Sequence, residues 1–246
     1  MKILAADCSA TSASCCVYDG DKIIASSFIN VKLTHSQTLL PMIEDMLENS
    51  CLKLSEIDCF AISKGPGSFT GVRIGISAIK GLAAVKDKDC IGVSTLEAIA
   101  YNYPCDSGIV CAVMDARCNQ VYNALFRIGK GEIIRLCDDR ALFCEDLYNE
   151  LCEKYPNEKI TVAGDGTAVF MPFVKSENIQ AADITHRYQN GVGVALAAYK
   201  KYENNEVIKP DELLPFYLRL PQAERELKQR QSGNNKDTAV HLQRYK

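Results

Sequence analysis

The sequence has no tryptophan and only three histidines, His35, His186 and His241. None of these has a partner at the H-x-x-x-H or H-E-x-x-H spacing of helical zinc sites, so no metal centre of that kind is expected. The twelve cysteines never occur as C-x-x-C. We therefore expect no metal site, and we interpret the thiols as small buried hydrophobic groups in a reducing compartment.

An excess of either charge is also missing. The net charge is −3 and the sequence pI is about 5.7, so no overall field draws the chain to nucleic acid or to an anionic membrane. No run of about 18 apolar residues could cross a bilayer, and Asp7 comes too early for a signal peptide. We expect a cytoplasmic protein with no membrane contact.

A glycine-rich segment from Gly65 to Gly75 separates a strand-like run from a helix-like run. A turn at such a place points backbone N–H groups at whatever lies above the strand. Its G-x-G-x-x-x-G spacing matches neither the dinucleotide nor the P-loop fingerprint. Two interpretations stay open: Gly65 and Gly67 cradle an anion, or the glycines only supply turn geometry and close packing.

The order of predicted elements repeats along the chain. In the first half we predict strands over Lys2–Asp7, Ser14–Tyr18, Lys22–Phe28, Asp58–Ser63 and Cys90–Val93, and helices after Thr34, Gly71 and Ser94. The second half begins the same order, with strands over Ile109–Met114, Val121–Phe126, Ile133–Cys137 and Ile160–Ala163 and a helix over Glu145–Lys154. Asp7 and Asp115 each end the first strand of their half.

This repeat predicts a duplicated α/β fold with lobes over residues 1–104 and 105–221, each with a mixed sheet and flanking helices. Two facing lobes of this kind are the layout of the actin-like ATPase (ASKHA) superfamily, in which the ligand cleft lies between the lobes. Residues 222–246 form a polar tail that we expect to be mobile or ordered only against a partner.

The helices after Thr34 and Gly71 carry apolar arcs of roughly 160° and 220°, whereas packing on one sheet needs somewhat over 100°. Deep burial within the chain explains such arcs, and so does a helix-on-helix interface in a homodimer or heterodimer. A charge at Met46 or Ile74 is expected to abolish complex formation and leave the subunit folded. The candidate contacts are Leu39, Met42, Ile43, Met46, Ile74, Ala78, Leu82 and Val85.

The segments Leu4–Ser9, His35–Gln37, Gly65–Gly75 and Met114–Arg117 closely resemble the TsaB (YeaZ) family, which is also peptidase M22-like. The resemblance covers Lys2 to about Pro221. It implies a non-catalytic scaffold that pairs with and activates the paralogous TsaD, which makes threonylcarbamoyladenosine next to the tRNA anticodon. Pairing would use the helices at Thr34–Asn49 and Gly71–Lys86.

The same resemblance implies further partners. TsaE would be the accessory ATPase, tRNA would be reached only through the complex, and the isolated chain could form a homodimer. No cofactor is expected on the chain alone, although ATP or ADP could lie at the subunit junction.

The residues offer this chain little chemistry of its own. The catalytic paralogue holds its metal with an H-x-x-x-H pair, whereas here Leu39 stands four residues after His35. Asp7, Gly65, Gly67 and Asp115 form a candidate vestigial nucleotide site in the cleft, and the two aspartates either coordinate a hydrated cation or only cap strand ends. The alternative function is a nucleotide-dependent phosphotransferase. A glycoprotease ranks last, because no catalytic-triad or metalloprotease motif supports it.

Overall fold

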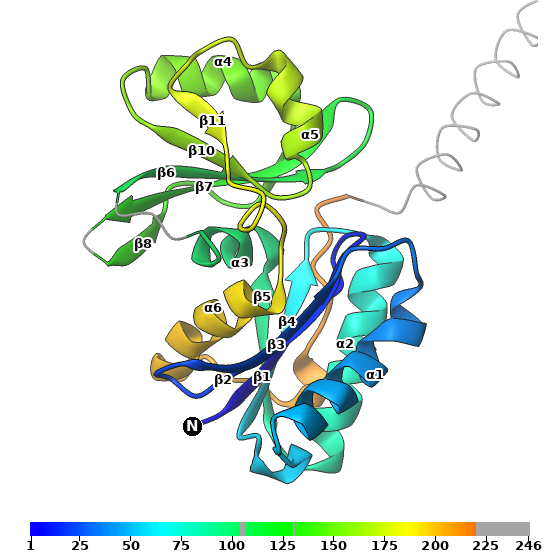
Figure 1. Cartoon of the computed structure of the whole chain (residues 1–246). Helices are drawn as coiled ribbons and strands as arrows, with labels where there is room; N and C mark the ends of the chain where they lie inside the picture. The colour runs from blue at the N-terminus through cyan, green and yellow to red at the C-terminus, as the bar shows by residue number, and fades with distance from the viewer. Residues whose placement is uncertain (104–106, 130, 220–246) are drawn as a thin grey trace, which may run out of the picture.

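The computed structural model describes residues 1–103, 107–129 and 131–219, and it has two lobes, each built on one mixed sheet (Figure 1). Helices α1 and α2 cover the outer face of the first sheet, and α4 and α5 cover that of the second. Helices α3 and α6 lie between the two sheets. In the described residues, no helix is both long and apolar enough to span a membrane.

The first sheet has the strand order β3-β2-β1-β4-β5. Strand β1 pairs antiparallel with β2 and parallel with β4, and β5 extends the parallel side. The bounds are β1 Ile3–Asp7, β2 Ala13–Tyr18, β3 Ile23–Ile29, β4 Cys59–Gly65 and β5 Asp89–Ser94.

The second sheet has the order β11-β10-β6-β7-β8, with β9 paired to β7. Read from its other edge, this is the order of the first sheet, with an antiparallel pair on one side of the first strand and parallel strands on the other. The predicted duplication is confirmed, although β9 and β11 were not predicted. The bounds are β6 Ser107–Asp115, β7 Gln120–Gly129, β8 Glu132–Arg135, β9 Arg140–Phe143, β10 Ile160–Ala163 and β11 Ile179–Ala181.

Helices α2, α3 and α6 begin at a side-chain cap, whereas Thr34, the residue before α1, makes no capping hydrogen bond. The Ser68 Oγ accepts a hydrogen bond from the Gly71 N–H at 3.2 Å, and the Ser94 Oγ accepts one from the Glu97 N–H at 3.3 Å. The bounds are α1 His35–Asn49, α2 Phe69–Val85, α3 Thr95–Tyr101, α4 Cys144–Lys154, α5 Thr167–Phe170 and α6 Gly191–Glu203, with 3₁₀ turns at Leu54–Glu56, Met171–Phe173 and Pro210–Glu212.

Helices cover both faces of the first sheet, so its central strands are apolar over most of their length and carry polar residues such as Asp7 and Ser63 near their ends. Leu4 packs towards α1 and α2, whereas Ile3 packs towards α6. The adjacent Cys15 and Cys16 divide in the same way. Burial raises the pKa of both thiols to about 12, so they behave as the small hydrophobic groups that the sequence predicted.

The lobe boundary drawn from the sequence needs one correction. Helix α6 packs on β1 and β2, and the backbones of Ile208 and Cys90 then exchange two hydrogen bonds. The chain therefore returns to the first lobe after residue 190, and does not stay in the second lobe to residue 221. A Cβ on Gly193 would lie 2.1 Å from the Ala98 oxygen, so glycine allows α6 to pack closely on α3. The predicted tail, residues 222–246, lies outside the described residues.

Candidate functional site

A groove of about 440 Å³ lies between α1 and α2. Leu40 in this groove is 47% exposed, whereas Ile74 and Ala78 are half-buried. The apolar surface is thus open to solvent along both helices. The groove is lined by His35, Ser36, Leu39, Leu40, Arg73, Ile74, Ser77 and Ala78.

Half of the predicted contacts are core residues. Leu39, Met42, Ile43 and Met46 are buried within the first lobe, so they offer no free surface in this structure. Because α1 packs on β2 and β3 of the sheet and on α2 beside it, the lobe itself covers most of the wide arc on that helix. A charge at Met46 would disrupt the core as well as any docking, so the expectation of a folded variant there is corrected.

The other four predicted contacts lie on α2 and keep some exposure. Ile74, Ala78 and Leu82 are half-buried, and Val85 is 78% exposed. Sequence reasoning missed Leu40 and Arg73 as groove residues. The sequence signal was their spacing. Leu40 lies four residues after Ser36 and Arg73 lies four residues before Ser77, and side chains four residues apart share one face of a helix.

His35 closes one end of this groove. One of its ring nitrogens, Nε2, lies 2.7 Å from the Ala10 carbonyl oxygen, while Nδ1 is buried without a hydrogen-bond partner among the described residues. A Cβ on Gly71 would lie 2.2 Å from the Cys8 oxygen and 3.0 Å from the His35 ring. The histidine therefore fastens the start of α1 to the loop after β1, and its ring packs against the start of α2.

A second hollow, also of about 440 Å³, lies between the two lobes. Gly67 and Asp115 both line it, whereas Asp7 and Gly65 are buried and are not among its lining residues. The structure thus brings together two of the four predicted cleft residues. The lining comes from Ser9–Thr11, Pro66–Thr70, Met114–Arg117, Tyr122, Asp165 and Phe216–Arg219.

Asp7 is wholly buried at the end of β1. Its carboxylate accepts hydrogen bonds from the Ser9 N–H at 3.0 Å, from the Ser9 hydroxyl at 2.9 Å and from the Ser63 hydroxyl. Burial raises the pKa of Asp7, and these hydrogen bonds oppose that rise. The carboxylate is therefore satisfied by groups of its own lobe.

The two motif glycines permit close backbone contacts. A Cβ on Gly65 would lie 2.3 Å from the Phe216 oxygen, and one on Gly67 would lie 2.4 Å from the Ser9 oxygen. The Ser68 N–H also donates to the Ser9 oxygen at 2.7 Å. These contacts favour the packing interpretation of the motif over the anion cradle.

Asp165 was not predicted as a site residue. It follows β10 as the glycine turn follows β4, and it lines the cleft. Burial raises its pKa to about 6, assisted by the charges of Asp115 and Asp7, while the Gln189 amide donates to it at 3.1 Å. In the described part of the chain, no three His, Cys, Asp or Glu side chains are grouped so that they could hold a metal ion.

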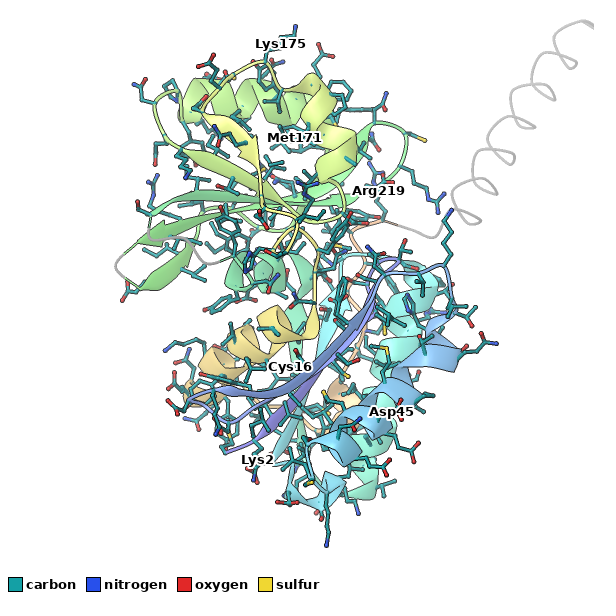
Figure 2. The ribbon with its side chains drawn as sticks, in the orientation of Figure 1. Lys2, Cys16, Asp45, Met171, Lys175 and Arg219 are labelled. Atoms are coloured by element: carbon teal, nitrogen blue, oxygen red, sulfur yellow. The ribbon has the colours of Figure 1, made fainter. Side chains whose placement is uncertain are left out.

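Residues 214–219, which we call the strap, close one side of the cleft and join the lobes. The Phe216 N–H donates to the Lys64 oxygen at 2.7 Å in the first lobe. In the second lobe, Arg219 donates to the Ala116 oxygen at 3.3 Å and to the Gln120 side chain. Figure 2 shows Arg219 where the strap passes between the lobes.

The protein-family model described as "TsaD: tRNA N6-adenosine threonylcarbamoyltransferase" matches residues 23–226. The tRNA threonylcarbamoyladenosine biosynthesis protein TsaB of Haemophilus influenzae is 31% identical over 89% of this chain and 94% of its own length. The TsaB of Escherichia coli is 29% identical over 89% of this chain and 95% of its own length.

A solved structure, YeaZ from Pseudomonas aeruginosa, superposes with a TM-score of 0.77 at 25% identity over 88% of this chain and 99% of its own. A second structure from that organism, described as similar to peptidase YEAZ, gives the same TM-score at 26% identity over 89% and 99% of the two chains. The duplicated actin-like ATPase fold expected from the sequence is confirmed.

Proposed function

This chain belongs to the TsaB (YeaZ) family, and from that premise we propose that it is a non-catalytic subunit in the synthesis of threonylcarbamoyladenosine in tRNA. Its role is to bind and activate a TsaD-type threonylcarbamoyltransferase. The observation that carries this proposal is the open apolar groove between α1 and α2.

The groove fits a partner helix. Leu40, Ile74 and Ala78 give it an apolar floor, and Ser36 and Ser77 are small enough for a second backbone to approach. Val85 extends the exposed apolar surface to the last turn of α2. A pair of helices on the partner would bury this surface by packing against α1 and α2.

The cleft supports a role without catalysis. The Asp7 carboxylate accepts hydrogen bonds from two serines of its own lobe. The space beside Gly65 and Gly67 is occupied by the backbone oxygens of Phe216 and Ser9, so it is not open to a phosphate. The strap lies against the same wall at Gly65. A close approach of a metal-bound triphosphate to Asp7 would require these contacts to open.

The direct test mixes the purified chain with a purified TsaD-type protein from the same organism. We expect the two to co-elute, and we expect tRNA modification by the TsaD-type protein to depend on addition of this chain. Unchanged modification without the chain, together with separate elution, would contradict the proposal.

The proposal extends to the remaining partners. A TsaE-type ATPase joins the complex, tRNA is contacted through the assembly, and the groove supports a homodimer when the partner is absent. A nucleotide, ATP or ADP, belongs at the subunit junction rather than on the isolated chain. Sedimentation of the chain alone and with each component distinguishes these states.

The alternative function is a nucleotide-dependent phosphotransferase that uses the cleft. It is favoured by one observation, namely that Gly67, Asp115 and Asp165 line the same hollow from both lobes. Calorimetry of the isolated chain with Mg-ATP decides the matter. Tight binding that is lost in Asp115→Asn, together with turnover, would support the alternative and count against a purely structural role.

A further inference from the structure

We infer that Arg73 binds a carboxylate of the partner, at the end of the groove next to the start of α2. This inference rests on the proposed function, because it assigns a charge to the surface of the protein that docks there. The occupant is an amphipathic helix whose apolar face covers Leu40, Ile74 and Ala78 and which carries an Asp or Glu beside Arg73.

Arg73 stands at the junction of the groove and the strap. Its side chain lines the groove together with Ile74, the next residue, and Ser77, which lies one turn further along the same helix. The Nε–H of Arg73 donates to the Tyr217 hydroxyl of the strap at 2.7 Å. The Arg73 guanidinium therefore lines the groove, and the Tyr217 hydroxyl of the strap holds it through Nε.

Two aromatic rings fix the orientation of this guanidinium. The Arg73 Cζ lies 4.0 Å from the centre of the Phe69 ring and 5.7 Å from that of Tyr217. The two rings are themselves 4.9 Å apart, with 33° between their planes. Stacking on these rings lowers the side-chain entropy that binding would otherwise cost.

The terminal nitrogens of Arg73 have no hydrogen-bond or ion-pair partner among the residues that the structure describes, and the side chain is exposed. Helix α2 carries no acidic residue, and α1 has none in its first turn. The groove therefore presents a positive charge, with four N–H donors on two terminal nitrogens, and no carboxylate among its lining residues. A planar fork of this kind matches the two oxygens of a carboxylate.

The experiment measures the affinity of the full chain for a TsaD-type protein of the same organism. Arg73→Gln is expected to weaken binding by about tenfold to a hundredfold, the range for loss of a hydrogen bond to a charged group. Arg73→Lys should recover only part of that loss, because an ammonium neither forks nor stacks as a guanidinium does. The matched control is Lys175→Gln, at the outer end of the second lobe (Figure 2).

A second series identifies the charge on the partner. Arg73→Glu should bind weakly, and replacing one acidic residue of the partner's docking helix by Lys should restore binding to that variant and weaken binding to the unmodified chain. Tyr217→Phe keeps both rings and removes only the bond to Nε, so a loss of less than about tenfold is expected.

The outcomes separate the two proposals. If the unmodified chain binds and Arg73→Gln binds equally well, with the same salt dependence, the assignment of Arg73 is wrong and the proposed function stands. If the unmodified chain does not bind the TsaD-type protein, the proposed function fails and this inference fails with it. Thermal unfolding of each variant separates a lost contact from a lost fold.

Discussion

At the scale of single residues, Asp165 links the cleft to pH. Its pKa is raised to about 6 by burial, so the unfolded chain, with an ordinary aspartate, releases this proton at lower pH. The stability that the neutral acid provides is therefore complete below about pH 4 and is lost as the pH rises through about 6.

We predict that Asp165→Asn unfolds at a higher temperature than the original chain at pH 7.5, because the ionised carboxylate costs about 1 to 3 kcal/mol there. Near pH 4 the difference should disappear. Thermal unfolding at both pH values checks this, with the exposed Asp45→Asn as the control. An equal effect of Asp165→Asn at both pH values would contradict the assignment.

Gly67 and Gly81 should respond oppositely to replacement by alanine. A Cβ at Gly67 would meet the Ser9 backbone, so Gly67→Ala is expected to cost about 2 kcal/mol or more of the free energy of unfolding. Gly81 lies inside α2 with no atom within 4 Å of its Cβ position, so Gly81→Ala should stabilise by roughly 0.5 to 1 kcal/mol.

Urea unfolding of the two glycine variants measures this difference. If Gly67→Ala were as stable as the original chain, the motif glycine would not be needed for packing. The anion-cradle interpretation would then regain support.

At the scale of elements, the proposed docking depends on the exposed surface of α2. Ile74→Glu is predicted to reduce binding of the TsaD-type protein by more than about tenfold, because it places a charge in an apolar interface. The matched control is Ile134→Glu on β8, where an isoleucine that is 53% exposed lies in the other lobe. Co-elution and calorimetry give the readout, and equal binding of both variants would remove α2 from the interface.

The elements themselves could largely be predicted from sequence, whereas their burial could not. The apolar period after Gly71 and the Ser94 cap place α2 and α3 nearly where they occur, although α2 begins two residues earlier, at Phe69. The apolar arc of α1, however, does not distinguish a sheet from a partner, and Leu39 and Met46 proved to be core. Periodicity gives the direction of each side chain along the helix but not what lies opposite it.

At the scale of the whole molecule, the duplication was visible in the sequence and the path of the chain was not. Helix α6 and the strap return to the first lobe, and no local pattern around Gly191 or Ile208 indicates which sheet they meet. The cleft was predicted from the repeat, but Asp165 and Arg219 join it through contacts between residues far apart in sequence. Such contacts follow from tertiary packing rather than from propensity.

The strap gives the last prediction. Arg219 holds it to the second lobe through the Ala116 oxygen, the Gln120 side chain and the ring of Tyr122, whose centre is 5.9 Å from the Arg219 Cζ. In Arg219→Ala the strap keeps only its first-lobe contacts, so the Phe216 N–H, which donates to the Lys64 oxygen, should exchange with solvent faster.

Hydrogen–deuterium exchange of the full chain measures this, and limited chymotrypsin cleavage at Tyr217 should rise in parallel. Amides of α4, which lies on the outer face of the second sheet, serve as the internal control and should not change. Unchanged exchange at Phe216 would mean that the first lobe alone holds the strap. The two lobes would then be joined through the α3 and α6 contact rather than across the cleft.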